Sequence, residues 1–370
     1  MGKDKNVIDT RYAESLPEIY AHVNDIYKNV KRPQCRPLLW FRGHEYAHYN
    51  LDPNLFRRCE YLYNKTGTYS RNHLREEYRF QNFMSRNYDK VDMRMPQTMI
   101  EWQEVMQHYQ TRTRLMDWSE SLTVALEFAL EAFIRPVKDL EVNEHCRTAT
   151  PVLWVLQPTE INKEVYRSFV KGPVSLIENA LHIRLGADAR TLAKRIQTEL
   201  RDKEKEGIYF NLPTQKEGNM NVMIGLSALE MLRNAYMGRE WEALWDFEMN
   251  PFFYLLLRYY SDGIPVKQDQ LPPLAIIHPY HSPRIKNQRG VFTVFPYYIL
   301  SEQQREMNAI AGKDLPIAME YMKQCIPYLH KIQILNPQRV ADELMVTGAK
   351  RGNLYPDMQS ISEDMENVVI

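Results

Sequence analysis

The chain has 370 residues, of which 44% are hydrophobic and 25% are charged, the composition of a globular protein that can bury a sizeable core. Lysine plus arginine and aspartate plus glutamate number 47 each, which excludes a general attraction to nucleic acid or acidic membranes through net charge. The four cysteines show no CxxC spacing, which argues against a disulfide framework or a zinc knuckle. No stretch approaches about 18 consecutive apolar residues, so we expect a cytoplasmic protein with no membrane partner.

The N-terminal part of the chain predicts helices around one early strand. Ser15 and Glu18 form a capping box that opens a helix, because apolar residues follow at helical spacing. Residues 37–43 are an apolar run typical of a strand, and residues 72–88 and 98–109 have helical periodicity.

Residues 107–129 are the most distinctive segment. A basic, threonine-rich stretch runs through Asp117 and Trp118 into an apolar helix that Ser119 or Ser121 can cap. Hydrogen-bond donors, an acceptor and a flat ring therefore gather where a strand passes into a helix, and such junctions often build binding sites.

The rest of the chain predicts a return to the sheet after a helical insertion. Four short apolar runs are typical of buried strands: 152–156, 274–277, 291–295 and 329–334. Residues between 160 and 270 have mostly helical periodicity, and Asn336-Pro337 opens a final helix that Gly348 can close. A length of 370 residues favours two domains, or one domain with an insertion. We predict an N-terminal helical segment (1–36), a core in two parts (37–158 and 273–370) and a helical insertion (159–272).

Several motifs resemble those of the FRG domain family. Phe41-Arg42-Gly43 is similar to the triplet that gives the family its name. Further resemblance lies in three later blocks: Gln107-His108-Tyr109 with Thr113-Arg114-Leu115 and Asp117-Trp118-Ser119; Arg284, Gln288, Gly290 and Phe292; and Lys331-Ile332 with Leu354-Tyr355-Pro356-Asp357. Gln110 stands where the family usually has glycine, and Arg112 where it often has proline.

A more distant resemblance is to ADP-ribosyltransferases. It implies an α+β fold with a mixed central β-sheet, flanking helices and NAD as the substrate. Arg42 on the first strand would then hold the diphosphate, Trp118 or Tyr109 would stack on nicotinamide, and Ser119 would fix the ribose. Gln288 occupies the late-strand position where this chemistry usually has glutamate, so Asp117 is the alternative carboxylate. The predicted catalytic residues are Arg42, Asp117, Ser119 and Gln288, and the predicted NAD-binding residues are Arg42, His44, Tyr109, Thr113, Arg114, Trp118 and Arg284.

The resemblance implies a toxin or anti-phage effector that modifies nucleic acid or protein and is restrained by a neutralising partner protein. A module that binds a nucleotide or nucleic acid without turning it over is a second hypothesis, since the same basic motifs suit it. A third is a zinc hydrolase through His44-Glu45-x-x-His48, although the preceding strand and following turn leave little room for the required helix. We therefore predict no metal cofactor. Each motif also has a structural interpretation, in which Arg42 bridges backbone carbonyls or pairs with Asp117, and His108, Tyr109 and Trp118 are packed residues.

Overall fold

The computed structural model describes residues 7–30, 38–57, 61–64, 67–87, 99–134, 150–185, 189–205, 224–225, 251–261, 263–277, 283–299, 306, 308, 310, 317–355, 358, 360 and 362. Within these ranges, no helix combines the length and the apolar character that crossing a membrane requires.

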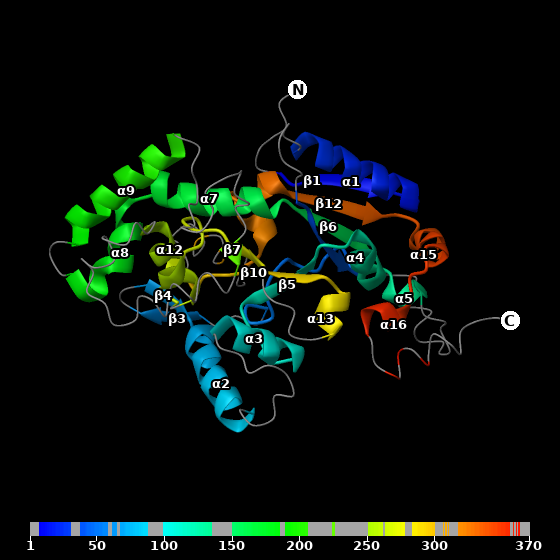
Figure 1. Ribbon diagram of the computed structural model, residues 1–370, viewed down its shortest axis with the longest axis horizontal. Helices are drawn as coiled ribbons and strands as arrows, with labels where there is room; N and C mark the ends of the chain where they lie inside the picture. The colour runs from blue at the N-terminus through cyan, green and yellow to red at the C-terminus, as the bar shows by residue number, and fades with distance from the viewer. Residues whose placement is uncertain are drawn as a thin grey trace.

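An eight-stranded mixed sheet forms the centre of the described structure, in the order β1-β12-β6-β2-β5-β10-β9-β7 (Figure 1). The two outer pairs, β1 with β12 and β9 with β7, are parallel, and the inner pairs are antiparallel. The strands are β1 (Asp9–Ala13), β2 (Trp40–His44), β5 (Leu115–Ser119), β6 (Val152–Leu156), β7 (Ile224–Gly225), β9 (Leu274–Ile277), β10 (Gly290–Val294) and β12 (Leu329–Ile334). A four-stranded second sheet has the order β3-β4-β11-β8, formed by Tyr61–Asn64, Gly67–Ser70, Tyr298–Ile299 and Val266–Lys267.

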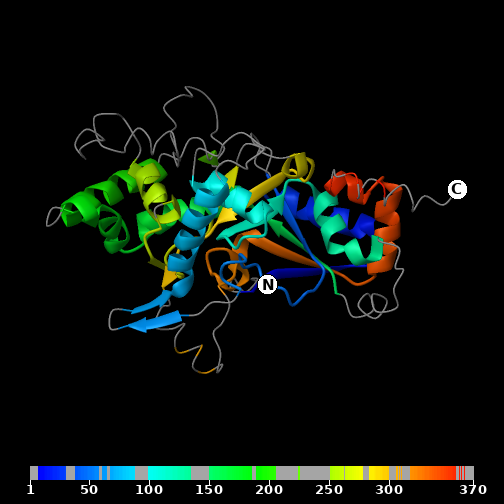
Figure 2. The same cartoon turned by 90° about the horizontal axis from the view of Figure 1, so that it is seen from below.

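Helices flank the large sheet, so the predicted α+β class with a mixed sheet and flanking helices is confirmed. At one end of the molecule lie α1 (Leu16–Val30), α4 (Leu122–Ala129), α5 (Glu131–Ile134), α15 (Pro337–Val346) and α16 (Arg351–Leu354) (Figure 1). At the other end lie α7 (Pro158–Lys171), α8 (Val174–Leu185), α9 (Ala189–Lys205) and α12 (Pro251–Leu256), which continues into a π-helical turn over Leu257–Ser261. Helices α2 (Arg71–Asn87) and α3 (Met99–His108) lie beside one another (Figure 2), and α13 (Pro283–Asn287) precedes β10.

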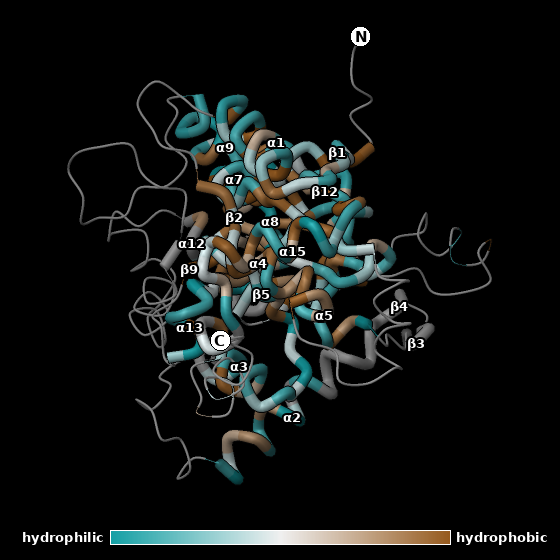
Figure 3. Tube along the Cα trace, turned by 90° about the vertical axis from the view of Figure 1, so that its right-hand side faces the viewer, coloured by the Kyte–Doolittle hydropathy of each residue, from teal (hydrophilic) through white to brown (hydrophobic). Residues whose placement is uncertain are grey.

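The residues of strand β6 explain why helices cover both faces of the large sheet. All five of its residues are buried, because alternate side chains enter two separate hydrophobic clusters. Trp154 packs in the cluster that contains α7, α8 and α9, whereas Leu153 and Val155 pack in the cluster that contains α1, α4 and α15. A continuous apolar run is what burial on both faces requires. Figure 3 shows the hydrophobic segments gathered around β2 and α4 in the interior.

The helices of residues 158–205 share their core with the sheet. Asn162 of α7 donates to the Ala275 carbonyl at 2.9 Å and accepts from the Ala275 N–H at 2.8 Å, so it satisfies a buried backbone position of β9. The domain boundaries stay a prediction, and residues 206–223 and 226–250 of the predicted insertion lie outside the described residues.

Most predicted elements are confirmed, with shifted ends. The predicted strand over 37–43 begins at Trp40, and the strand predicted over 291–295 spans Gly290–Val294. Glu18 accepts from the backbone N–H of Glu14 at 2.8 Å, one residue before the predicted capping position. The sequence interpretation missed β1 and the β3-β4 hairpin, whose short strands have mixed polarity, and it missed α16, which follows Gly348.

Gly43 allows α4 to pack directly against β2. A Cβ atom at this position would overlap the backbone carbonyl oxygen of Ala125 and would lie 2.7 Å from the backbone nitrogen of Ala129. Both obstacles are backbone atoms of one helix, so no side-chain rotation can relieve them. Only glycine at this position permits the observed distance between the helix and the strand.

We therefore expect Gly43→Ala to lower the free energy of unfolding by at least about 1–3 kcal/mol, the usual cost of overpacking a core. Chemical denaturation followed by circular dichroism measures this loss. Gly290→Ala is the matched control, because its Cβ would meet a side-chain methyl group of Ile285 at 3.0 Å, which can move. Equal losses in the two variants would contradict this account of Gly43.

Candidate functional site

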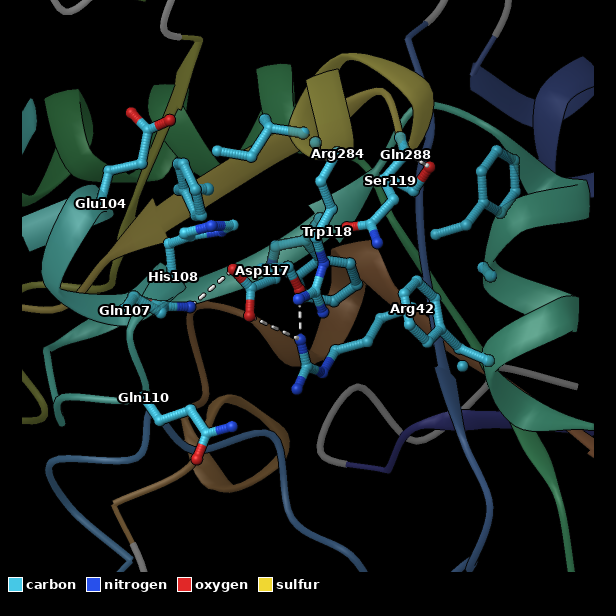
Figure 4. Close-up of a pocket in the computed structure, with 17 residues that line it drawn as sticks. Arg42, Glu104, Gln107, His108, Gln110, Asp117, Trp118, Ser119, Arg284 and Gln288 are labelled. Atoms are coloured by element: carbon cyan, nitrogen blue, oxygen red, sulfur yellow. Dashed lines mark hydrogen bonds and ion pairs between the residues drawn. The ribbon is translucent and has the colours of Figure 1, made fainter. Parts of the chain in front are cut away.

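A cavity of about 310 Å³ opens where β2, β5 and β10 meet helices α3, α4 and α13 (Figure 4). Its polar and charged lining residues are Arg42, Glu104, Gln107, His108, Gln110, Asp117, Ser119, Arg284 and Gln288. Its apolar lining residues are Phe41, Gly43, Trp118, Ala125, Phe128, Ile285, Gly290 and Phe292. The cavity brings together six of the ten residues predicted to form a site: Arg42, Asp117, Trp118, Ser119, Arg284 and Gln288.

Arg42 bridges two strands that separate beside the cavity. Strands β2 and β5 are joined at one register pair, Phe41 with Ser119. Beyond that pair the Nη1 of Arg42 donates to the backbone carbonyl of Asp117, and it lies 3.9 Å from the Asp117 carboxylate. Arg42 therefore supplies a hydrogen bond that the strand ladder lacks there, and it presents positive charge to the cavity at the same time.

His44 supports Arg42 and does not line the cavity. The Nε of Arg42 donates to His44 Nε2 at 2.9 Å. Because arginine can only donate, this ring nitrogen must be unprotonated. Burial, together with the charges of Arg42 and Arg57, lowers the pKa of His44 to about 2, which agrees with a neutral ring.

The zinc motif lacks the structure that it needs. His44 ends β2, and residues 45–50 form a bend and a turn, so no helix places His44 and His48 on one face. The Nε2 of His44, one of its two possible metal-ligating nitrogens, already accepts from Arg42. Among the residues that the structure describes, no group of three histidine, cysteine, aspartate or glutamate side chains could hold a metal ion.

Asp117 is held from both sides at the centre of the cavity (Figure 4). The Nε2 of Gln107 donates to Asp117 Oδ1 at 2.6 Å, and the Thr113 hydroxyl donates to Gln107 Oε1 at 2.6 Å. Thr113 is buried and acts through Gln107, so it positions Asp117 without lining the cavity. The Asp117 side chain is 58% exposed, which leaves its second oxygen accessible to a ligand.

Ser119 and Gln288 are tied to backbone groups. The Ser119 hydroxyl donates to the Gln288 carbonyl at 2.7 Å and accepts from the Ser121 N–H at 2.9 Å. The Nε2 of Gln288 donates to the Leu354 carbonyl at 3.1 Å. Gln288 lies in the turn between α13 and β10, so its expected place on a late strand is wrong.

Trp118 is a core residue that also contributes to the cavity wall. It is 3% exposed, and its Nε1 donates to the Thr293 hydroxyl at 3.1 Å. Tyr109 follows α3, is 57% exposed and does not line the cavity. The predicted helix cap is Ser121, whose hydroxyl accepts from the Val124 N–H, and not Ser119.

Arg114 is fully buried away from the cavity. Its Nε lies 3.6 Å from Glu76 Oε2, and its other nitrogens donate to the carbonyls of Phe295 and Ser261. Glu76 also accepts from the Arg114 backbone N–H and from the Tyr297 hydroxyl. Complete burial raises the pKa of Glu76, while the Arg114 charge opposes that shift. The pair therefore joins α2, β5 and the segment after β10, and this network holds the wall that carries Asp117.

Arg284 belongs to the cavity and stacks on the C-terminal segment. Its guanidinium carbon lies 4.6 Å from the centre of the Tyr355 ring, and Tyr355 contacts Phe128 edge-to-face. A stacked guanidinium keeps its N–H donors in the plane of the group, where they can bind a planar or tetrahedral anion. Among the described residues, none accepts a hydrogen bond from the Arg284 side chain.

Glu104 and His108 are cavity residues that the sequence interpretation did not select. Each lies one helical turn from the other on α3, and Glu104 is 3% exposed. A glutamate at i and a histidine at i+4 on one face of a predicted helix was the signal that could have found them.

Gln110 ends α3 in a left-handed conformation. Its φ is 62°, its N–H donates to the Gln107 carbonyl, and the Thr111 N–H donates to the Met106 carbonyl. These two bonds form a Schellman motif, in which the left-handed position is usually glycine. The glycine that the resemblance places at this position would adopt this conformation without steric cost, and glutamine adopts it here.

The comparisons with known proteins identify one region of the chain. Residues 38–136 match the FRG domain, so an FRG domain is present there. It contains β2, α3, β5 and α4, which form most of the cavity. No curated protein and no solved structure matches the chain.

Removing the charge of Arg114 tests its structural role. We expect Arg114→Met to lower the free energy of unfolding by about 3–5 kcal/mol, because it leaves Glu76 buried without its cation. The double variant Arg114→Met with Glu76→Gln should recover part of that loss in a double-mutant cycle measured by chemical denaturation. Additive losses would show that the two residues act independently.

Gln110→Gly should raise the free energy of unfolding by about 1 kcal/mol, because glycine removes the steric cost of the left-handed conformation. Thermal and chemical denaturation measure the change. Gln110→Ala is the control, since alanine removes the same polar atoms and keeps the Cβ. A Gln110→Gly protein no more stable than the alanine variant would contradict this interpretation of the turn.

Proposed function

We propose that the cavity binds NAD and that the protein transfers ADP-ribose from it to an acceptor. The observation that carries this proposal is the gathering of two arginines, two carboxylates and several aromatic side chains in one cavity. These are the groups that a dinucleotide with a cationic leaving group calls for: cations for the diphosphate, flat rings for the bases and negative charge for the reacting end.

The diphosphate would be bound by Arg284, with Arg42 as a second cation. The Tyr355 stack holds the Arg284 guanidinium at one orientation, so little side-chain entropy is lost when a phosphate binds. Arg42 already donates through Nε and Nη1, which leaves its remaining N–H donors for the ligand.

The nicotinamide end would lie toward Asp117. Its carboxylate is oriented by Gln107 and is accessible, so it can favour positive charge that builds on the ribose as nicotinamide leaves. Gln288 is neutral and its amide is committed to Leu354, which favours Asp117 over Gln288 for this role.

A second candidate function is a module that binds a nucleotide without turning it over. The hydrogen bonds of Ser119 favour this hypothesis, because its hydroxyl already donates to one backbone group and accepts from another. A ribose hydroxyl would have to compete with these bonds. The acceptor class, the restraining partner and a role as a toxin or in anti-phage defence remain proposals drawn from the family resemblance.

Isotopically labelled NAD tests both candidates. We expect Arg284→Ala to weaken NAD binding by about tenfold or more, since it removes charge-assisted hydrogen bonds. We expect Asp117→Asn to lower nicotinamide release at saturating NAD by about 100-fold. Calorimetry measures binding, and chromatography measures nicotinamide and labelled acceptor after incubation with cell RNA, DNA and protein.

Arg339→Ala is the matched control, because Arg339 lies on α15, pairs with Glu343 at 2.9 Å and is not part of the cavity lining. Binding that depends on Arg284 without nicotinamide release would favour the binding module. Absence of NAD binding by the folded wild-type protein would contradict the proposal.

A further inference from the structure

We infer that Glu104 and His108 form an acid–base pair that activates the acceptor, an inference that rests on the proposed transfer. His108 accepts the proton of the attacking group, and Glu104 stabilises the charge that the imidazole then carries. The acceptor would then enter along α3, at the face of the cavity that these two residues form.

The geometry of α3 places the pair on one cavity wall. Four residues separate Glu104 from His108, so their side chains lie on the same face of the helix one turn apart. Both line the cavity, on the side across from Ser119 and Gln288 (Figure 4). Glu104 is 3% exposed, whereas His108 is partly exposed, so the imidazole is the member that an incoming molecule can reach.

The surroundings of His108 favour its neutral imidazole, which is the form that can act as a base. Glu104 faces it from its own helix, and Arg284 faces it from α13. Burial and the Arg284 charge lower the pKa of His108, while Glu104 opposes this shift. The ring is therefore neutral at neutral pH and can accept a proton, and Glu104 compensates for the cost of its protonation. Arg42 and Asp117 are the other charged groups of the lining, on β2 and β5.

The chemical step balances without an added oxidant or reductant. An acceptor hydroxyl, or water, forms a bond from its oxygen to C1′ of the nicotinamide-side ribose. The C1′–N bond breaks, and its electron pair neutralises the pyridinium nitrogen of the departing nicotinamide. The acceptor's proton passes to His108 and then to solvent. Arg284 comes from α13 but is near enough to His108 to lower its pKa, so a diphosphate bound to Arg284 would place the ribose between the pair and Asp117.

The rate of transfer against pH tests this assignment. In the wild type the rate should rise with pH through a pKa below the usual histidine value, since the base must be neutral. Glu104→Gln should move that rise to lower pH, because it removes the charge that raises the His108 pKa. His108→Ala should lower transfer at least about 100-fold while NAD affinity is retained, and added imidazole should restore part of the rate.

The controls separate this inference from the proposed function. His22→Ala is a matched variant on α1, where His22 contacts the Tyr12 carbonyl outside the cavity. His108→Asn replaces His108→Ala should the alanine variant fail to fold by circular dichroism. Transfer that keeps its wild-type rate and pH profile in the His108 variants overturns the assignment and leaves the proposed function standing. A wild-type protein that binds NAD without transfer, or does not bind it, removes the proposed transfer and the pair with it.

Discussion

The cavity exists because β2 and β5 meet at one residue pair and then separate. Phe41 opposite Ser119 is the register pair between them, and Arg42 fills the gap that follows by donating to the Asp117 carbonyl. On the same strand, the missing side chain of Gly43 lets α4 approach β2 directly. Each residue of the FRG triplet therefore has a structural role at this junction. Phe41 packs in the core and pairs with β5. Arg42 donates a hydrogen bond to β5, and Gly43 lets α4 pack against β2.

The same junction explains why the motif residues fall into two groups. Asp117 and Trp118 lie next to one another on β5, yet Asp117 projects into the cavity and Trp118 packs in the core with its indole N–H satisfied. Thr113 and Arg114 precede them and hold the strand, one through Gln107 and the other through Glu76. Residues that occur together in a motif thus divide into those that contact a ligand and those that fix the contacting residues in place.

The sequence predicted the architecture better than it predicted where individual side chains lie. Helical periodicity and apolar runs located α1, α2, α3, β6, β9, β10 and β12 within a few residues, because burial on one or both faces leaves a direct pattern. It could not show that Arg114 points away from the cavity, since a buried salt bridge with Glu76 depends on a contact between distant segments. It also could not show that Gln288 occupies a turn with its amide bound to Leu354, or that Glu104 and His108 face the cavity. Gln110 is an intermediate case: the resemblance places glycine there, but the left-handed backbone that the structure contains could not be read from the glutamine itself.

The cavity wall is also completed from outside residues 38–136, which match the FRG domain. Arg284, Gln288 and Phe292 come from α13 and β10, and Tyr355 supports Arg284 from the C-terminal segment. The most direct test of the account is a crystal structure of the protein with NAD. The account predicts the diphosphate within hydrogen-bond distance of Arg284, about 2.7–3.2 Å, and the nicotinamide ribose beside Asp117. NAD bound elsewhere on the protein, with the cavity open to solvent, would contradict it.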